Sequence, residues 1–165
     1  MNNAKLFLLG GFSLRILIIM NSKSKVYFFF PAGKVGLANR SILKRFVEKL
    51  FKAENKQISQ VNYIFCTDRS IKKINKQYLE HDYATDIITF DLSEDKTITA
   101  DIYISVERVR ENARTLGLSF KSEIHRVIFH GALHLCGYRD KTNTEIKKMR
   151  GKEDLYLNKY GISHF

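Results

Sequence analysis

The segment from Ser122 to Asp140 constrains the fold more than any other part of the chain. A helix that is apolar almost all round is buried in its domain. Gly137 ends this helix, because glycine accepts the left-handed conformation that commonly follows a helix. The pattern therefore predicts a buried helix over residues 122–136. On a helical wheel its apolar residues fall on two opposite faces: Ile124, Val127, Ile128, Gly131 and Leu135 on one, and Phe129 and Leu133 on the other.

Two histidines lie together on the flank of this predicted helix. His130 and His134 are four residues apart, so they project from adjacent turns and can bind one metal ion. Asp140 follows the helix end closely enough for the chain to fold back toward both imidazoles. Two imidazoles and one carboxylate leave a fourth zinc position open, which is typical of catalytic sites. Histidines at this spacing also occur on solvated helix faces, but burying two imidazoles without a partner costs free energy and favours a shared metal.

Two other potential ligands point away from the pair, and the sequence lacks the motifs of two other classes of zinc enzyme. His125 points more than about 100° away from the pair, so we expect a surface or capping histidine. Cys136 also projects away and is expected to be a small buried residue. No glutamate follows His130, so the HExxH site of zinc proteases is absent. No HxE followed by PCxxC occurs, which argues against a zinc nucleobase deaminase.

The motif resembles the signature of the YbeY family, bacterial metal-dependent endoribonucleases that act in ribosomal RNA maturation. That signature reads H-G-x-L-H-L-x-G-Y-D-H, and its three histidines bind zinc. The chain reads H-G-A-L-H-L-C-G-Y-R-D from His130, which places Asp140 at the third ligand position and Arg139 just before it. Aspartate is a competent zinc ligand. The resemblance therefore implies one Zn²⁺ per chain, held by His130, His134 and Asp140.

The resemblance extends from about residue 60 to residue 155. Residues 75–78 and 85–90 are similar to the family block N-x-x-[YF]-R…T-D-V-L-S-F, and residues 100–105 are similar to its strand G-D-I-x-I-S. The arginine of that block, which is regarded as functional in the family, is Leu79 here. We hypothesise that Arg139 supplies a catalytic cation in its place and partly offsets the charge of the aspartate ligand, with a solvated loop side chain as the alternative.

Charge is distributed unevenly along the chain. The net charge is +11, and residues 21–79 alone carry +10, whereas residues 80–101 carry −6. A basic sector of this strength suits a phosphate backbone, because Lys and Arg bind phosphates with release of counterions. We therefore expect RNA contacts in residues 21–79, for example at Lys72 and Lys73, with general solubility as the alternative. The two cysteines lie far apart in sequence, which indicates a reducing compartment and no disulfide-linked partner.

The N-terminal segment is expected to lie outside the domain. Residues 6–20 are apolar but broken by glycines and Arg15, and they are too short to span a bilayer. No A-x-A-like cleavage site follows, so the segment also differs from a secretory signal peptide. We interpret residues 1–19 as an upstream extension, with translation starting at Met20, and residues 20–165 as one metal-dependent endoribonuclease domain. These features predict a cytoplasmic protein with no membrane partner.

Strand-like and helical patterns alternate along the rest of the chain. The short acidic connection 91–96 favours an antiparallel strand pair. We therefore expect a single α+β domain, in which a small mixed β-sheet is packed with helices and a zincin-like metal site lies on the buried helix. The expected strands are 25–30, 60–66, 86–90 and 97–104, and the expected helices are 41–53, 68–78, 106–116, 122–136 and a last one that a capping box of Thr142 and Glu145 opens.

The resemblance implies a zinc-dependent, single-strand-specific endoribonuclease. Its expected role is ribosomal RNA maturation at the 3′ end of the small-subunit rRNA and ribosome quality control, with the small ribosomal subunit as partner. Two alternatives stay open: a non-catalytic RNA-binding ribosome assembly factor, and a metallohydrolase with a non-RNA substrate. Asp101, Glu123 and His81 are candidates for the general base, although structural roles are more common for residues of these kinds.

Overall fold

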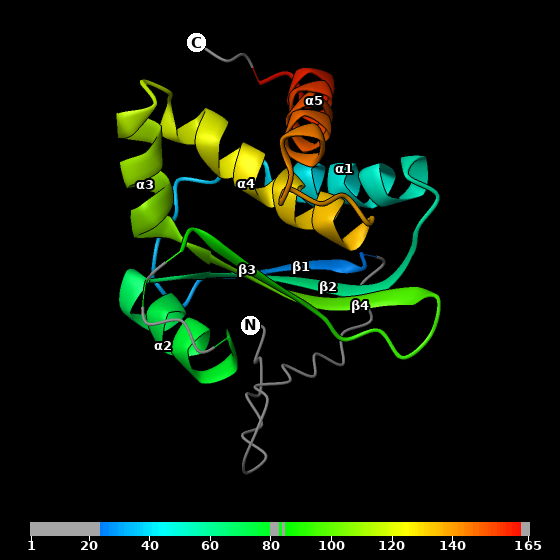
Figure 1. Ribbon diagram of the computed structural model, residues 1–165, viewed down its shortest axis with the longest axis horizontal. Coiled ribbons are helices and arrows are strands. Elements are labelled where there is room, and N and C mark those ends of the chain that lie inside the picture. Colours follow the sequence, from blue (N-terminus) through cyan, green and yellow to red (C-terminus); the bar gives the residue numbers. More distant parts are fainter. Residues whose placement is uncertain (1–23, 80–82, 84, 163–165) are drawn as a thin grey trace.

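The computed structural model describes residues 24–79, 83 and 85–162, whose arrangement is shown in Figure 1. The expected helices and strands are confirmed, with bounds shifted by a few residues. The predicted extension, residues 1–19, lies outside the described residues. None of the described helices is both long and apolar enough to cross a membrane. The elements in chain order are β1 (Val26–Phe29), α1 (Arg40–Ala53), β2 (Gln57–Cys66), α2 (Asp68–Leu79), β3 (Ile87–Asp91), β4 (Thr97–Ser105), α3 (Val106–Thr115), α4 (Phe120–Leu135) and α5 (Asn143–Tyr160).

The described strands form one mixed sheet in the order β1-β2-β4-β3. β1 pairs with β2 and β2 pairs with β4 in parallel, whereas β3 pairs with β4 antiparallel across the short acidic connection. The second half of β2, from Val61 to Cys66, is buried without a break, as expected for a strand that is covered on both faces. The predicted α+β class, with one antiparallel pair at the acidic connection, is therefore confirmed.

Helices cover the two sides of the sheet unequally. α1, α3, α4 and α5 lie on one side, and α2 lies on the other (Figure 1). α4 approaches the sheet so closely that a Cβ added at Gly131 would lie 2.8 Å from Cδ1 of Ile87 and 3.1 Å from Cγ2 of Ile102. Since these two side chains belong to β3 and β4, the helix that carries the histidine pair packs directly over the antiparallel strands.

α4 is the buried helix that the sequence predicts, but one of its histidines corrects an expectation. His125 is not at the surface: it is 4% exposed, with its ring 5.2 Å from that of Tyr160 on α5. A helical wheel gives the direction of a side chain but not which other helix covers that direction. Cys136 is half-buried against the core, and both cysteines are free.

Candidate metal centre

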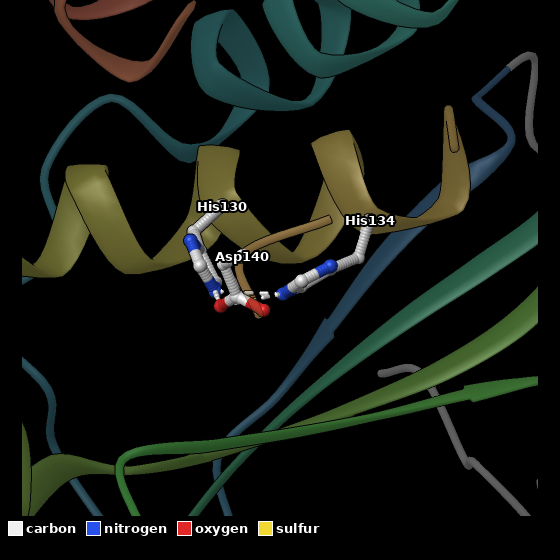
Figure 2. Close-up of side chains that lie close together, drawn as sticks. All are labelled: His130, His134 and Asp140. Carbon is white, nitrogen blue, oxygen red and sulfur yellow. Dashed lines mark hydrogen bonds and ion pairs between the residues drawn. The ribbon is translucent and has the colours of Figure 1, made fainter. Parts of the chain in front are cut away.

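α4 and the loop after it bring the three predicted ligands together (Figure 2). His130 and His134 project from consecutive turns, and their Nε2 atoms lie 2.8 Å apart. Oδ2 of Asp140 lies 3.6 Å from Nε2 of His130 and 3.5 Å from Nε2 of His134. The three ligand atoms all lie within 4.8 Å of one another, so a single ion can contact all of them.

The loop reverses direction at Gly137, which has a φ of +97°. Residues with a Cβ rarely adopt this left-handed conformation, so glycine is the residue that suits it. Two backbone hydrogen bonds hold the turn: the Gly137 N–H donates to the His134 carbonyl at 2.9 Å, and the Tyr138 N–H donates to the Leu133 carbonyl at 3.0 Å. The turn carries Asp140 back toward the histidines, as the position of the glycine predicts.

The outer nitrogens of both imidazoles are bound by hydrogen-bond acceptors. Nδ1 of His130 lies 2.7 Å from Oε1 of Glu153, and Nδ1 of His134 lies 2.9 Å from the carbonyl oxygen of Tyr138. Because a carboxylate and a carbonyl only accept, each Nδ1 carries a proton, and the Nε2 of each neutral ring presents a lone pair. Two such lone pairs 2.8 Å apart repel each other unless a cation or a proton lies between them. Two imidazole nitrogens and a carboxylate oxygen are a donor set that fits Zn²⁺.

The pKa values of the two histidines move in opposite directions. Burial acts to lower the pKa of His130, but the hydrogen bond and the charge of Glu153 outweigh it and raise the pKa above its ordinary value. Burial, followed by the charge of His130, lowers the pKa of His134. A proton on His130 is therefore the alternative to a metal ion at this pair.

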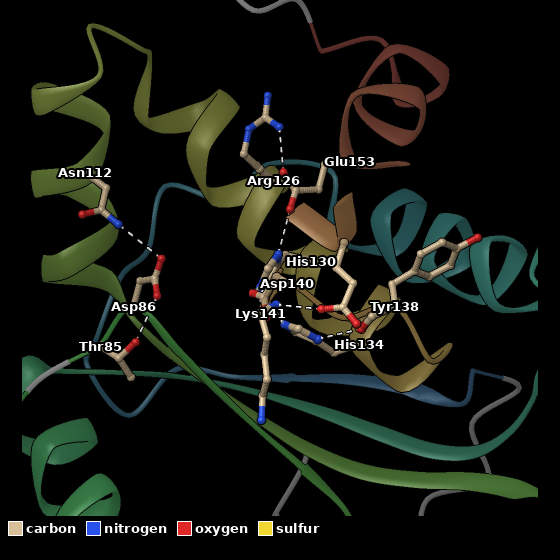
Figure 3. Close-up of polar contacts among 11 residues, drawn as sticks. Thr85, Asp86, Asn112, Arg126, His130, His134, Tyr138, Asp140, Lys141 and Glu153 are labelled. Atoms are coloured by element: carbon tan, nitrogen blue, oxygen red, sulfur yellow. Dashed lines mark hydrogen bonds and ion pairs between the residues drawn. The ribbon is translucent and has the colours of Figure 1, made fainter. Parts of the chain in front are cut away.

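Glu153 of α5 supports His130, and Arg126 of α4 in turn binds Glu153 (Figure 3). Glu153 has a side chain only 6% exposed, and its second oxygen accepts a hydrogen bond from Arg126 at 2.8 Å. Arg126 also pairs with Asp154 at 2.8 Å. Burial acts to raise the pKa of Glu153, but the hydrogen bonds from His130 and Arg126 outweigh it and lower the pKa. Glu153 is therefore ionised and orients the imidazole, which is the usual arrangement behind metal-binding histidines.

Sequence reasoning missed Glu153 and Arg126. Glu153 lies 23 positions from His130 along the chain, and no local pattern predicts which residue of α5 reaches α4. Arg126 did leave a signal, because it is a cation inside the apolar segment that predicts the buried helix. A buried charge requires a partner of opposite charge, so a carboxylate elsewhere in the chain could have been inferred without being identified.

Two cavities flank the three ligands. One, of about 560 Å³, borders His134 and lies against β3. The other, of about 510 Å³, borders His130 and Asp140. Both volumes fall in the range of small-molecule sites. A chain-like substrate that crosses the ligand set can therefore place a group in each cavity.

The other predicted site residues lie apart from the ligands. Arg139 lines a third cavity, of about 340 Å³, together with Glu54 and Glu145, and this cavity borders none of the three ligands. Lys72 and Lys73 are exposed on α2, which lies on the opposite side of the sheet from α4 (Figure 1). The catalytic role of Arg139 and the RNA contacts of Lys72 and Lys73 stay predictions.

One of the three candidate bases lies beside the ligands. Glu123 lines the 510 Å³ cavity, is 4% exposed, and has an Oε2 atom without a hydrogen-bond partner among the described residues. Burial raises the pKa of its carboxyl group. Asp101 accepts a hydrogen bond from Asn62 at 2.8 Å and faces away from α4, because its neighbour Ile102 faces α4 and strand side chains alternate. His81 lies outside the described residues.

Comparisons with known proteins show the family of the chain. The chain is 44% identical to endoribonuclease YbeY of Cytophaga hutchinsonii over 134 residues, which cover 81% of this chain and 94% of that protein. It is 47% identical to endoribonuclease YbeY of Flavobacterium psychrophilum over 116 residues, or 70% of this chain and 83% of that one. A solution structure from Thermotoga maritima matches with a TM-score of 0.59 and 29% identity, over 82% of this chain and 91% of that one. The family model for endoribonuclease YbeY matches residues 34–161, and the chain therefore belongs to that family.

Proposed function

We propose that this protein is a zinc-dependent, single-strand-specific endoribonuclease. Its proposed role is ribosomal RNA maturation at the 3′ end of the small-subunit rRNA and ribosome quality control, in the cytoplasm, with the small ribosomal subunit as partner. Membership of the endoribonuclease YbeY family supports cleavage of RNA phosphodiester bonds. The observation that carries the zinc is the pair His130 and His134, whose Nε2 lone pairs converge at 2.8 Å while both Nδ1 protons are bound elsewhere.

The proposed chemistry divides between the ion and the chain. When bound, the ion supplies a Lewis acid that polarises a phosphate oxygen and lowers the pKa of water. Glu153 and the Tyr138 carbonyl hold the two imidazoles in the tautomer that leaves Nε2 available. Glu123 is the candidate general base that borders the ligand set. The aspartate ligand makes the centre less positive than a third histidine would, so a cation that meets the substrate phosphate gains importance.

A cleavage assay on single-stranded and structured RNA, run with and without a chelator, tests this function. We expect the single-stranded RNA to be cleaved, the paired RNA to resist, and the chelator to stop the reaction. RNA binding without cleavage would favour a non-catalytic ribosome assembly factor. If RNA is neither bound nor cleaved, a metallohydrolase with a non-RNA substrate is the remaining alternative. Zinc in the same sample should be close to one ion per chain, which elemental analysis measures.

The salt dependence of RNA affinity tests the basic sector of residues 21–79. Affinity should fall steeply with salt, because each neutralised phosphate releases counterions. Replacing Lys72 and Lys73 by Glu should flatten this dependence. The same double change at Lys147 and Lys148, an exposed pair on α5 outside the basic sector, is the matched control. An equal effect of the two double changes would reduce the charge excess of residues 21–79 to general solubility.

A further inference from the structure

Lys141 directly follows the third ligand, and its side chain extends from the loop toward the sheet (Figure 3). It lines the 560 Å³ cavity together with His134. The side chain is exposed, and within the described part of the chain its ammonium group forms no ion pair with a carboxylate. Lys141 therefore brings an uncommitted positive charge to the ligand side of the loop, where a phosphate group would arrive.

The opposite wall of this cavity is the free edge of β3. Two backbone hydrogen bonds bracket this strand and join it to β4. The Ser105 N–H donates to the Asp86 carbonyl, and the Leu92 N–H donates to the Thr99 carbonyl, each at 2.8 Å. In an antiparallel pair, alternate residues bond to the same neighbour, so the odd-numbered residues of β3 turn their N–H and C=O groups away from β4. These are Ile87, Thr89 and Asp91, all of which line the cavity, and no described strand pairs with this edge.

The groups on this edge suit a polar ligand more than an apolar one. An unpaired strand edge presents both donors and acceptors, and the Thr89 hydroxyl has no hydrogen-bond partner among the described residues. The one carboxylate of the edge, on Asp91, accepts hydrogen bonds from the backbone N–H and the hydroxyl of Ser93 at 3.0 and 2.5 Å. These two hydrogen bonds hold Oδ1 of Asp91 within its own turn.

We propose that this cavity holds the nucleotide next to the one at the ligand set, with Lys141 bound to its phosphate and the β3 edge bound to its base or sugar. The proposal rests on the proposed function and adds a subsite to it. A volume of about 560 Å³ accommodates a nucleotide. In a duplex the Watson–Crick edges of the bases are already paired, so they are not available to the strand edge. The subsite therefore selects an unpaired strand, in agreement with a single-strand-specific enzyme.

Lys141 differs from two nearby cations, Arg139 and Lys148, in the cavity that it lines. Arg139 and Lys148 line the third cavity, which borders none of the ligands. Lys148 also lies 5.3 Å from the centroid of the Tyr138 ring. Removal of the Lys148 charge therefore serves as a control for charge loss near the loop, and removal of Arg139 tests the cation that the sequence favours.

Binding of a short, single-stranded 2′-O-methyl oligouridine provides a readout separate from turnover, and gel electrophoresis of the same samples checks that the oligouridine stays intact, because hydrolysis by water does not require a 2′-hydroxyl. Fluorescence anisotropy would be measured over a range of salt concentrations for the zinc-loaded protein and its variants. We expect Lys141→Ala to weaken binding about tenfold, the size of one lost charge-assisted hydrogen bond. The slope of log affinity against log salt should decrease by about 0.7, the value for one phosphate contact on a single strand. Lys141→Arg should keep both values, and Lys148→Ala should leave both unchanged.

Kinetics and zinc content complete the test. Because the contact exists before the reaction as well as during it, Lys141→Ala should raise KM for single-stranded RNA while kcat changes little. Zinc content should stay at the parental value, and a blunt-ended RNA duplex should bind equally to both proteins. An unchanged salt slope in Lys141→Ala would overturn the subsite. A loss of oligouridine affinity in Arg139→Ala that Lys141→Ala does not show would also overturn it. A parental protein that binds the oligouridine through Lys141 but cleaves no RNA would instead refute the proposed function and leave the subsite standing.

Discussion

The loop of residues 136–141 has two sides that differ in how their polar groups are satisfied. On the side away from the ligands, Glu54 accepts hydrogen bonds from the hydroxyl groups of Tyr138 and Tyr156 and from the ammonium of Lys152. On the other side, the Nε2 atoms of the two candidate ligand histidines lie 2.8 Å apart, a distance that requires a metal ion or a proton between them. Complete partnering stabilises the fold, whereas unpartnered groups that converge in a partly open site are available to bind an ion.

Tyr138 connects the two sides. Its hydroxyl donates to Oε2 of Glu54 at 2.8 Å, and its carbonyl oxygen lies 2.9 Å from Nδ1 of His134. The hydrogen-bond network around Glu54 therefore fixes the residue that orients one of the ligands. The comparison predicts that changes on the ligand side remove metal and activity, while changes on the Glu54 side mainly lower stability.

The largest effect should come from His134→Ala. Loss of this ligand leaves only two protein groups for the ion, so zinc should be lost and RNA cleavage should fall by several orders of magnitude. Elemental analysis, circular dichroism and the cleavage assay would be applied to the same preparation. Asp140→His is the matched variant that should retain zinc, because it introduces the residue that the family signature carries at this position. Loss of zinc from Asp140→His would show that Asp140 is not a ligand.

Glu153→Gln should have the next largest effect. The change removes the charge that holds the Nδ1 proton of His130, and the loss of such a supporting group typically lowers metal affinity about 10- to 100-fold. Competition with a chromogenic zinc chelator measures this affinity. Asp154→Asn is a suitable control. The Asp154 side chain is 48% exposed and pairs with Arg126, so this change removes a charge beside Arg126 and leaves the contact between Glu153 and His130 in place. Equal losses in the two variants would indicate a general disturbance of α5.

Glu54→Gln should act on stability more than on metal binding. We expect the free energy of unfolding to decrease by about 2 kcal/mol, the typical size of a hydrogen bond to a charged group. Urea denaturation of the zinc-free proteins measures this value, and chelator competition should show a smaller loss of zinc affinity than for Glu153→Gln. A larger loss of zinc affinity in Glu54→Gln would contradict the separation of the two sides.

The smallest effect is the pH dependence of that stability difference. Burial acts to raise the pKa of Glu54, but the hydrogen bonds from Lys152, Tyr156 and Tyr138 outweigh it and place the pKa below its ordinary value of 4.5. The stabilisation is therefore fully present above the pKa of the unfolded chain and is lost as the pH falls through the lower pKa of the folded protein. Unfolding curves should show the gap between the parental protein and Glu54→Gln closing below about pH 4.5. A gap that stays constant down to acid pH would contradict this assignment.

Local patterns are sufficient to predict the helices, the strands and the close approach of the three candidate ligands. The wheel around Ile124 predicts the burial of α4, Gly137 predicts where the chain reverses, and the spacing of the ligands along 130–140 is short enough for local geometry to bring them together. The antiparallel pair at the acidic connection was predicted for the same reason. These features depend on contacts between residues that are close in sequence.

The remaining features depend on contacts between distant parts of the chain. Neither Glu153 behind His130 nor Glu54 behind Tyr138 has a local signal, because the partners lie 23 and 84 positions apart. The burial of His125 was missed because α5 covers a face that the wheel leaves open. The parallel order of β1, β2 and β4 likewise follows from how the helices pack on the sheet.

The absence of a side chain at Gly131 has a consequence for substrate choice. This residue lies between the two ligand histidines on α4, where an added Cβ would press on Cδ1 of Ile87 at 2.8 Å. A Cβ here would force either the end of the Ile87 side chain to move or α4 to lie farther from β3. A larger residue at this position would therefore change the width of the cleft between α4 and β3 without replacing any candidate ligand or any charged side chain. The family signature also carries glycine between its first two histidines, so the same close approach of helix to strand is expected in relatives that match the signature.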